Sequence, residues 1–339
     1  MPLTYPLHLP GTAGIRASEW GLTSNNVVHE SPFTGQQQVI SRVGNYWSGM
    51  LELPPMTEDQ AAVWRGFVTG LKGQYGTFWA GDPDNRRPRG EIKNYGRNLL
   101  LNGGGEQSSN SYPFYTEDIA VRTPYPGVNK GVRAGDKLTV SVDLKVDAAA
   151  AAAGVTSYFT LFIIKNGVWW SQVYAHSSDL TYTRYTRTLT IEDNFDYIRL
   201  GLYHYPSTET AGLAYCRNAM VEVGDTASSY TDPIVVNGGG QTGDEIALRG
   251  LPVDTEAVIA AGDYFQVGTQ LFQATWNASS DSNGEATVKI EPALRSSPAD
   301  GELVIFDNPQ GIFALTDDVR WRADQFKQFG MSFGIRERF

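Results

Sequence analysis

The 339-residue sequence predicts a mainly β protein: a small β-barrel or split-barrel scaffold with one helix at about residues 57–72, carrying an inserted antiparallel β-sandwich. Two observations predict this fold class. Most apolar stretches alternate polar and apolar residues with the period of two that is typical of strands. The sequence also contains 36 glycines and only 19% charged residues, a balance that favours short strands and turns over long solvated helices.

The charge and the cysteine count exclude several kinds of partner. A formal net charge of -10 opposes binding to phosphate backbones, so we expect no nucleic-acid partner. Arg86, Arg87 and Arg89 form the nearest basic cluster, but the surrounding prolines and aspartates are typical of a solvated loop. Cys216 is the single cysteine, which excludes an intramolecular disulfide and a thiolate zinc cluster, and its apolar neighbours predict a buried, inert thiol.

The sequence gives no sign of a membrane segment or of export. No apolar run approaches the ~18–20 residues that a membrane helix needs, so we expect no membrane insertion. The first residues lack the basic start of a secretory signal and are interrupted by Pro2, Pro6 and Pro10. We therefore expect synthesis in the cytoplasm without an encoded export route.

The N-terminal part, residues 1–93, combines strands with the predicted helix. Residues 47–53 alternate in the manner of a half-buried strand. Thr57 and Gln60 then form a capping-box pattern, and Gly73 suits the C′ position of the helix. Apolar residues between them recur at i, i+3, i+4 and i+7: Trp64, Phe67, Val68 and Leu71. This spacing predicts a helix that packs its aromatic face against a sheet.

The middle part, residues 94–233, is all-β and has its own rhythm of strands. Residues 136–146 alternate as a long strand with one solvated face. The pair Asn166-Gly167 predicts a tight hairpin between two strands, and three further alternating segments follow at the spacing of an antiparallel sandwich. The alanine run at 148–153 is predicted to be a loop or a single helical turn.

The C-terminal part, residues 234–339, contains further strands separated by glycine-containing turns. Both outer parts are typical of pieces of a small barrel. The simplest organisation is therefore a discontinuous scaffold of residues 1–93 and 234–339 with residues 94–233 inserted in a surface loop. The glycine-rich residues 238–243 are predicted to be a flexible linker, because no helix pattern follows that could complete a phosphate site.

Two sets of motifs resemble known families. The segments "MTEDQAAVWRGFVTGLKGQYGTFWAGDP", "GDYFQVGTQLFQAT" and "MSFGIRERF" resemble the distal tail proteins of long-tailed bacteriophages, the siphophages. The middle part, from "GRNLLLNGG" to "RNAMVEVGDTASSYTDP", resembles the jelly-roll carbohydrate-binding modules of phage tail proteins. The order of the two, a module inside a tail scaffold, is more specific than either motif alone.

The resemblance implies a structural role in the virion. It implies a ring, usually a hexamer, in the distal tail or baseplate that joins the tail tube protein to the hub and tip proteins. The inserted module would point outward and bind a host surface glycan during adsorption. The subunit would be assembled in the host cytoplasm, and we expect neither a cofactor nor enzymatic activity.

Motifs for catalysis or metal binding are weak. The sequence has no nucleophile elbow and no HExxH motif, and we expect structural or surface roles for its four histidines, His8, His29, His176 and His204. Residues 281–285 resemble part of a calcium loop but are more typical of a hairpin turn. Glu192, Asp193 and Asp196 lie in a turn and are the acidic residues that a polysaccharide depolymerase would use. A depolymerase and a free lectin-like protein are the alternative functions.

Carbohydrate binding is the predicted activity of the insert, because sugar rings stack on aromatic faces beside fixed polar groups. The aromatic candidates are Trp169, Trp170, Tyr174, Tyr203 and Tyr205. Adjacent residues face opposite sides of a strand, which predicts one tryptophan in the core and the other exposed. Tyr203 and Tyr205 share a face, and both face outward if Leu202 faces the core. The alternative is that these aromatic residues only cover the sandwich.

Overall fold

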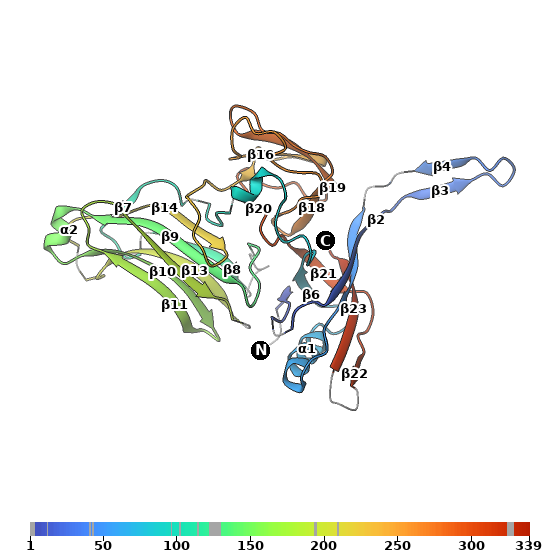
Figure 1. Cartoon of the computed structure of the whole chain (residues 1–339), viewed down its shortest axis with the longest axis horizontal. Coiled ribbons are helices and arrows are strands. Elements are labelled where there is room, and N and C mark those ends of the chain that lie inside the picture. Colours follow the sequence, from blue (N-terminus) through green and yellow to red (C-terminus); the bar gives the residue numbers. More distant parts are fainter. Residues whose placement is uncertain are drawn as a thin grey trace.

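A computed structural model describes residues 4–11, 13–40, 42, 44–95, 97–101, 103–113, 115–121, 130–192, 195–208, 210–323 and 329–339. Its mainly β architecture, with several antiparallel sheets, confirms the predicted fold class. The sheets group into three bodies that lie side by side in Figure 1: a scaffold sheet, a small barrel-like sheet and a sandwich. In the described part of the chain, no helix has both the length and the apolar character to cross a bilayer.

The scaffold sheet is built from both ends of the chain. Its seven strands are β1 (Leu7–His8), β2 (Ala17–Thr23), β5 (Tyr46–Glu52), β6 (Thr77–Ala80), β21 (Gly311–Leu315), β22 (Trp321–Ala323) and β23 (Phe329–Glu337). The order is β1-β6-β21-β23-β5-β2, with β22 paired to β23. Because β23 lies between β21 and β5, the two flanks of the predicted insert share one sheet.

The helix α1 (Glu58–Gly70) packs its apolar face into the core of the scaffold sheet. Thr57 and Gln60 form the predicted capping box. The predicted C′ position at Gly73 is wrong, because the helix ends at the C-cap Leu71 and the first left-handed residue is Lys72, with a φ of 54°. Leu71 is fully buried, and its N–H donates to the carbonyls of both Phe67 and Val68. The bond to Val68 gives the last turn a 3-10 geometry, so the helix ends one residue before the predicted position.

The barrel-like sheet follows the order β15-β16-β19-β18-β17-β20 and has its own core. Its strands are β15 (Val235–Val236), β16 (Gly243–Arg249), β17 (Tyr264–Val267), β18 (Gln270–Ala274), β19 (Glu285–Leu294) and β20 (Val304–Ile305). Ile92, from the 3-10 helix η1 (Glu91–Asn94), is fully buried in this core. The flanks of the insert therefore build two interiors, one under the scaffold sheet and one in the barrel.

The glycine-rich residues 238–243 are not the predicted flexible linker. They connect β15 to β16, and the Gln241 side chain holds the loop together. Its amide nitrogen donates to the carbonyls of Asn237 and Gly238, and its oxygen accepts the N–H of Ala247. The loop is thus an ordered connection between the paired strands β15 and β16 of the barrel, because the Gln241 side chain supplies hydrogen bonds that backbone pairing does not make there.

The sandwich consists of two four-stranded antiparallel sheets, β11-β10-β13-β8 and β12-β9-β14-β7. Its strands are β7 (Gln107–Ser109), β8 (Tyr115–Val121), β9 (Lys137–Val146), β10 (Thr156–Lys165), β11 (Val168–Ser177), β12 (Thr183–Thr190), β13 (Tyr197–Tyr205) and β14 (Ala214–Val223). Asn166 and Gly167 have φ values of 53° and 75°, as the predicted hairpin requires, and the alanine run forms the short helix α2 (Ala148–Ala152). Cys216 is buried, as predicted, and burial raises the pKa of its thiol to about 12, which keeps it protonated at neutral pH.

The hairpin of β3 (Val27–Glu30) and β4 (Gln37–Ile40) forms an arm that projects away from the three bodies (Figure 1). Val28 and Val39 pair across the two strands and are 55% and 58% exposed. Phe33, at the tip of the arm, is 96% exposed. The arm therefore presents an apolar surface that no described core of the chain covers.

Buried ion pairs join the bodies. Arg97 connects the sandwich to the barrel: its guanidinium lies 3.1 Å from a Glu222 oxygen and 2.9 Å from an Asp307 oxygen. Arg295 of the barrel forms two 2.7 Å bonds to Glu337 at the end of β23. Both Glu222 and Glu337 are buried, so each carboxylate depends on its arginine for compensation of its charge.

We expect Arg97→Met to lower the free energy of unfolding by about 3 kcal/mol, because it leaves two buried carboxylates without a cation. Arg16→Met is the matched control, since Arg16 and Glu52 form an exposed pair whose loss costs less than about 1 kcal/mol. Urea unfolding followed by fluorescence and circular dichroism measures both. Equal midpoints for the two variants would contradict the role of Arg97.

Candidate functional site

The outer face of the sheet β11-β10-β13-β8 carries the candidate site. Along β10, Phe159 and Leu161 are fully buried in the sandwich core, and Leu202 of β13 lies in the same core. Alternate residues of these strands must therefore face outward. The outward residues of β10 include Tyr158 and Phe162, and an aromatic cluster surrounds each of them.

The first cluster is centred on Tyr158. The His176 ring stacks on it with ring centres 4.3 Å apart, and the Tyr174 and Tyr205 rings lie 5.9 and 5.8 Å away. The register explains the cluster, because β10 pairs Tyr158 with His176 on one side and with Tyr203 on the other. Tyr174 and Tyr205 are 48% and 47% exposed, so both rings offer an open face to solvent.

Tyr203 faces outward, as expected from the buried Leu202, but it is only 7% exposed. The Tyr112 ring covers it at 4.6 Å, and the Tyr203 ring lies over Gly201, where a Cβ atom would overlap it. Burial raises the pKa of Tyr203 to about 12, so its phenol stays neutral. Tyr203 thus lies beneath the exposed surface, and the Tyr112 ring packs on top of the Tyr203 ring.

The second cluster lies at the hairpin end of the same face. Trp169 stacks on Phe162 with ring centres 4.1 Å apart and is 58% exposed, whereas Phe162 is buried beneath it. Trp170 is 52% exposed, and its indole N–H donates to Glu192 at 2.6 Å. The prediction that one tryptophan lies in the core is wrong. The β10–β11 register shifts between Ile163 and Ile164, and both indoles lie beside the hairpin turn, at the end of the sandwich.

Polar side chains lie beside the two clusters. The Thr160 hydroxyl donates to the Gln172 amide oxygen at 3.3 Å. Arg199 and Asp118 form a bidentate pair at 2.6 and 3.2 Å, which neutralises both charges. The face therefore combines stacking surfaces with hydrogen-bonding groups and paired charges, a composition suited to sugar hydroxyls.

The acidic residues that a depolymerase would use have structural partners. Glu192 accepts the bond from Trp170, and Asp196 accepts the backbone N–H of Gly167 at 2.7 Å, so both hold the β10–β11 hairpin. Asp193 lies outside the described residues. In residues 281–285, Asp281 accepts the N–H groups of Asn283 and Glu285, as in a tight turn. Among the residues that the structure describes, no cluster of three or more His, Cys, Asp or Glu could hold a metal.

The structure adds four aromatic residues that sequence reasoning did not assign to the site: Tyr112, Tyr158, Phe162 and His176. His176 was expected to have only a structural or surface role. The register set by the Asn166-Gly167 hairpin would by itself pair Tyr158 with Ala175, and the one-residue shift between Ile163 and Ile164 places His176 opposite Tyr158 instead. No strand pattern could have indicated that Tyr112 belongs to the site, because it lies in an irregular segment before β8.

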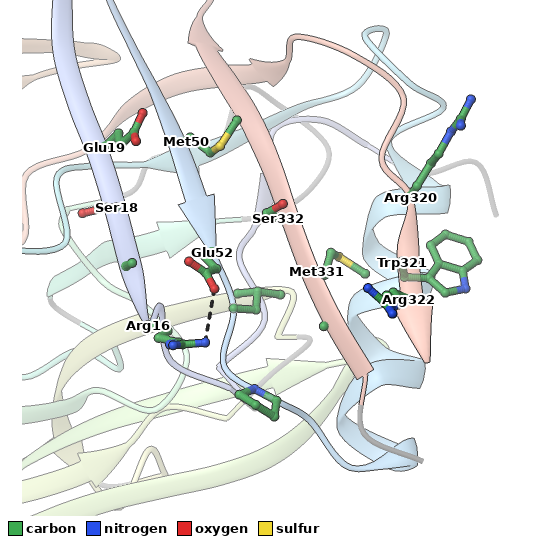
Figure 2. Close-up of a pocket in the computed structure, with 14 residues that line it drawn as sticks. Arg16, Ser18, Glu19, Met50, Glu52, Arg320, Trp321, Arg322, Met331 and Ser332 are labelled. Atoms are coloured by element: carbon green, nitrogen blue, oxygen red, sulfur yellow. Dashed lines mark hydrogen bonds and ion pairs between the residues drawn. The ribbon is translucent and has the colours of Figure 1, made fainter. Parts of the chain in front are cut away.

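The scaffold sheet carries a separate groove of about 510 Å³ (Figure 2). It lies on the face formed by β2, β5 and β23, with β22 along one side. Met50 and Trp321 line it and are 49% and 45% exposed, and the Arg16–Glu52 ion pair closes one end. Open apolar surface beside charged groups is typical of a protein contact rather than of an enclosed small-molecule site.

Comparison with known proteins gives only distant likenesses. No family model and no curated protein matches the chain. Similar solved structures include one described as "CBM4 structure and function", at 10% identity and a TM-score of 0.22, covering 60% of this chain and 86% of that chain. The CBM22-1 xylan-binding domain from Paenibacillus barcinonensis Xyn10C matches at 13% identity and a TM-score of 0.25, covering 39% and 98%.

The enzymatically active domain of tailspike protein 4 of bacteriophage CBA120 matches at 8% identity and a TM-score of 0.22. The match covers 63% of this chain and 20% of that chain. At identities and TM-scores this low, these likenesses carry no argument about the function of the chain.

We expect His176 to titrate below the ordinary value of about 6.5, because its ring stacks on Tyr158 and the partial desolvation lowers its pKa. The imidazole is then neutral at pH 7 and gains its proton only as the pH falls below its lowered pKa. Tyr158→Ala uncovers the ring and should move the midpoint back toward 6.5. NMR titration of the His176 ring protons measures both, with Tyr75→Ala as the distant control. A wild-type midpoint above 6.5 would contradict the partial desolvation of the ring.

Proposed function

We propose that the sandwich binds a host surface carbohydrate through the outer face of β11-β10-β13-β8. The observation that carries this proposal is the pair of half-exposed rings, Tyr174 and Tyr205, arranged around Tyr158 and His176. Exposed aromatic faces beside neutral hydrogen-bonding groups are what the C–H faces and hydroxyls of a sugar require. The function is binding without catalysis and without a cofactor.

We further propose that the whole chain is a structural subunit of a phage distal tail or baseplate ring. The subunit would join the tail tube protein to the hub and tip proteins in the virion, after assembly in the host cytoplasm. The resemblance of the scaffold motifs to siphophage distal tail proteins supports this role. The arrangement also supports it, because the sandwich and the arm lie on opposite sides of the molecule (Figure 1).

The arm supports assembly into a ring. An isolated two-stranded hairpin is marginally stable in water, and exposed apolar strands tend to pair with another chain. Val28, Phe33 and Val39 would be covered by the neighbouring subunit, and a head-to-tail contact of this kind forms a ring when the rotation between subunits closes. A ring, with a hexamer as the expected form, displays several weak sugar sites to one cell surface and so raises the effective affinity.

We expect Tyr174→Ala and Tyr205→Ala each to weaken carbohydrate binding by about 1 kcal/mol, or ~5-fold, because each removes one stacking surface. Trp276→Ala is the control, since that indole is 71% exposed on the barrel, away from the site. Binding to an array of bacterial surface polysaccharides measures the effect. Release of sugar fragments by the wild type, lost in Asp193→Asn, would instead favour a depolymerase.

We expect the triple variant Val28→Ser, Phe33→Ser, Val39→Ser to remain a folded monomer while the wild type forms rings. Analytical ultracentrifugation and negative-stain images measure assembly, and circular dichroism checks the fold. Leu180→Ser, which alters an exposed apolar residue of the sandwich, should leave the rings intact. A wild type that is monomeric at all concentrations and absent from purified particles would leave the free lectin-like protein as the better interpretation.

A further inference from the structure

We infer that the ligand of this face is an extended, uncharged glycan chain that lies along the strands and contacts both aromatic clusters at once. The inference rests on the proposed carbohydrate-binding function and adds the orientation, the length and the charge of the ligand. It follows from the register of the sheet, from the height of Tyr112 above it and from the pairing of the charges.

The two clusters are separated along the strands, not across them. Tyr205 lies opposite Thr156 at one end of β10, and Trp169 stacks over Phe162 near the other end. Tyr174 lies between them, opposite Thr160, so the exposed rings follow the strands. The six residues from Thr156 to Phe162 span ~20 Å, and a ligand that contacts both end rings must be a chain of several sugar rings. Thr160 and Gln172 lie between the two end rings and offer hydrogen bonds to the sugar rings in the middle.

The alternative direction, across the strands, is obstructed. Next to Tyr158 on β13 is Tyr203, whose ring is covered by Tyr112. Tyr112 is 49% exposed and stands one layer above the strand surface, so it forms a wall on the β8 side. A chain that stacks on Tyr174 must pass beside this wall and continue along β10 and β11 toward Trp169.

The charges of the described residues favour an uncharged ligand. Arg199 is paired with Asp118, and the Arg187 guanidinium donates to the carbonyls of Tyr174 and Thr186. Lys165 lies 4.4 Å from the centre of the Trp170 ring. Carboxylates lie beside two of these cations: Asp118 pairs with Arg199, and Glu192 binds the same indole that Lys165 covers. Because the described residues of this face carry both signs of charge, a polyanionic chain would gain little to replace its lost hydration.

The test uses a panel of uncharged linear oligosaccharides, cello-, xylo-, manno- and maltohexaose and the matching trisaccharides, titrated by calorimetry into the full-length protein. We expect a hexasaccharide to bind at least tenfold more tightly than its trisaccharide. Trp169→Ala should abolish this difference in affinity while the trisaccharide still binds at the tyrosine cluster. Trp276→Ala is the matched control, because that indole is 71% exposed on the barrel, away from both clusters, and it should retain the length dependence.

Two results would overturn the inference and leave the proposed function standing. One is binding of tri- and hexasaccharide with equal affinity in the wild type. The other is tighter binding of an acidic polymer, with polygalacturonate as the probe, than of any uncharged probe at physiological salt. Absence of binding to every sugar probe, polygalacturonate included, would overturn the proposed function and the inference together.

Discussion

The pairing of β23 with both β5 and β21 is the constraint on which the rest of the molecule depends, because it fixes the two ends of the chain in one sheet. On the far side of β21, Ala80 of β6 pairs with Gly311, so the chain leaves and re-enters the sheet at one point. Everything between these residues is a single connection between neighbouring strands. This connection forms the barrel, and the sandwich is inserted in the sequence of the barrel, between Ile92 and Ile234.

Because each body is inserted in the sequence of another, the few charged contacts between the bodies are important for their relative orientation. The sandwich and the barrel share Leu303 and Ile305 at their boundary, but apolar contact alone does not define an angle. Arg97 fixes the relative orientation of the two bodies, because its planar guanidinium bonds to carboxylates from both of them. A fixed angle matters for the proposed function, in which the sandwich presents its aromatic face away from the scaffold.

The aromatic face is a consequence of core packing on the other side of the same strands. Phe159, Leu161 and Leu202 must be buried, so the residues between them are forced outward whatever their type. Outward positions of a sheet are usually polar, and half-exposed tyrosine and tryptophan rings at these positions gain nothing from the core. These rings are therefore available to a partner, and the proposed function uses this face rather than the interior.

The sequence by itself determined the elements whose physics is local. The capping box and the spacing of Trp64 and Leu71 define α1, the Asn166-Gly167 pair defines its hairpin, and alternation defines the strands and the side on which Tyr203 lies. Only the tertiary structure decided which side chains are exposed. Tyr112, distant in the chain, covers Tyr203, and a register shift leaves both Trp169 and Trp170 outside the core. The alternation of a strand determines the face of the sheet on which a side chain lies, whereas the exposure of that side chain depends on whether another segment covers it.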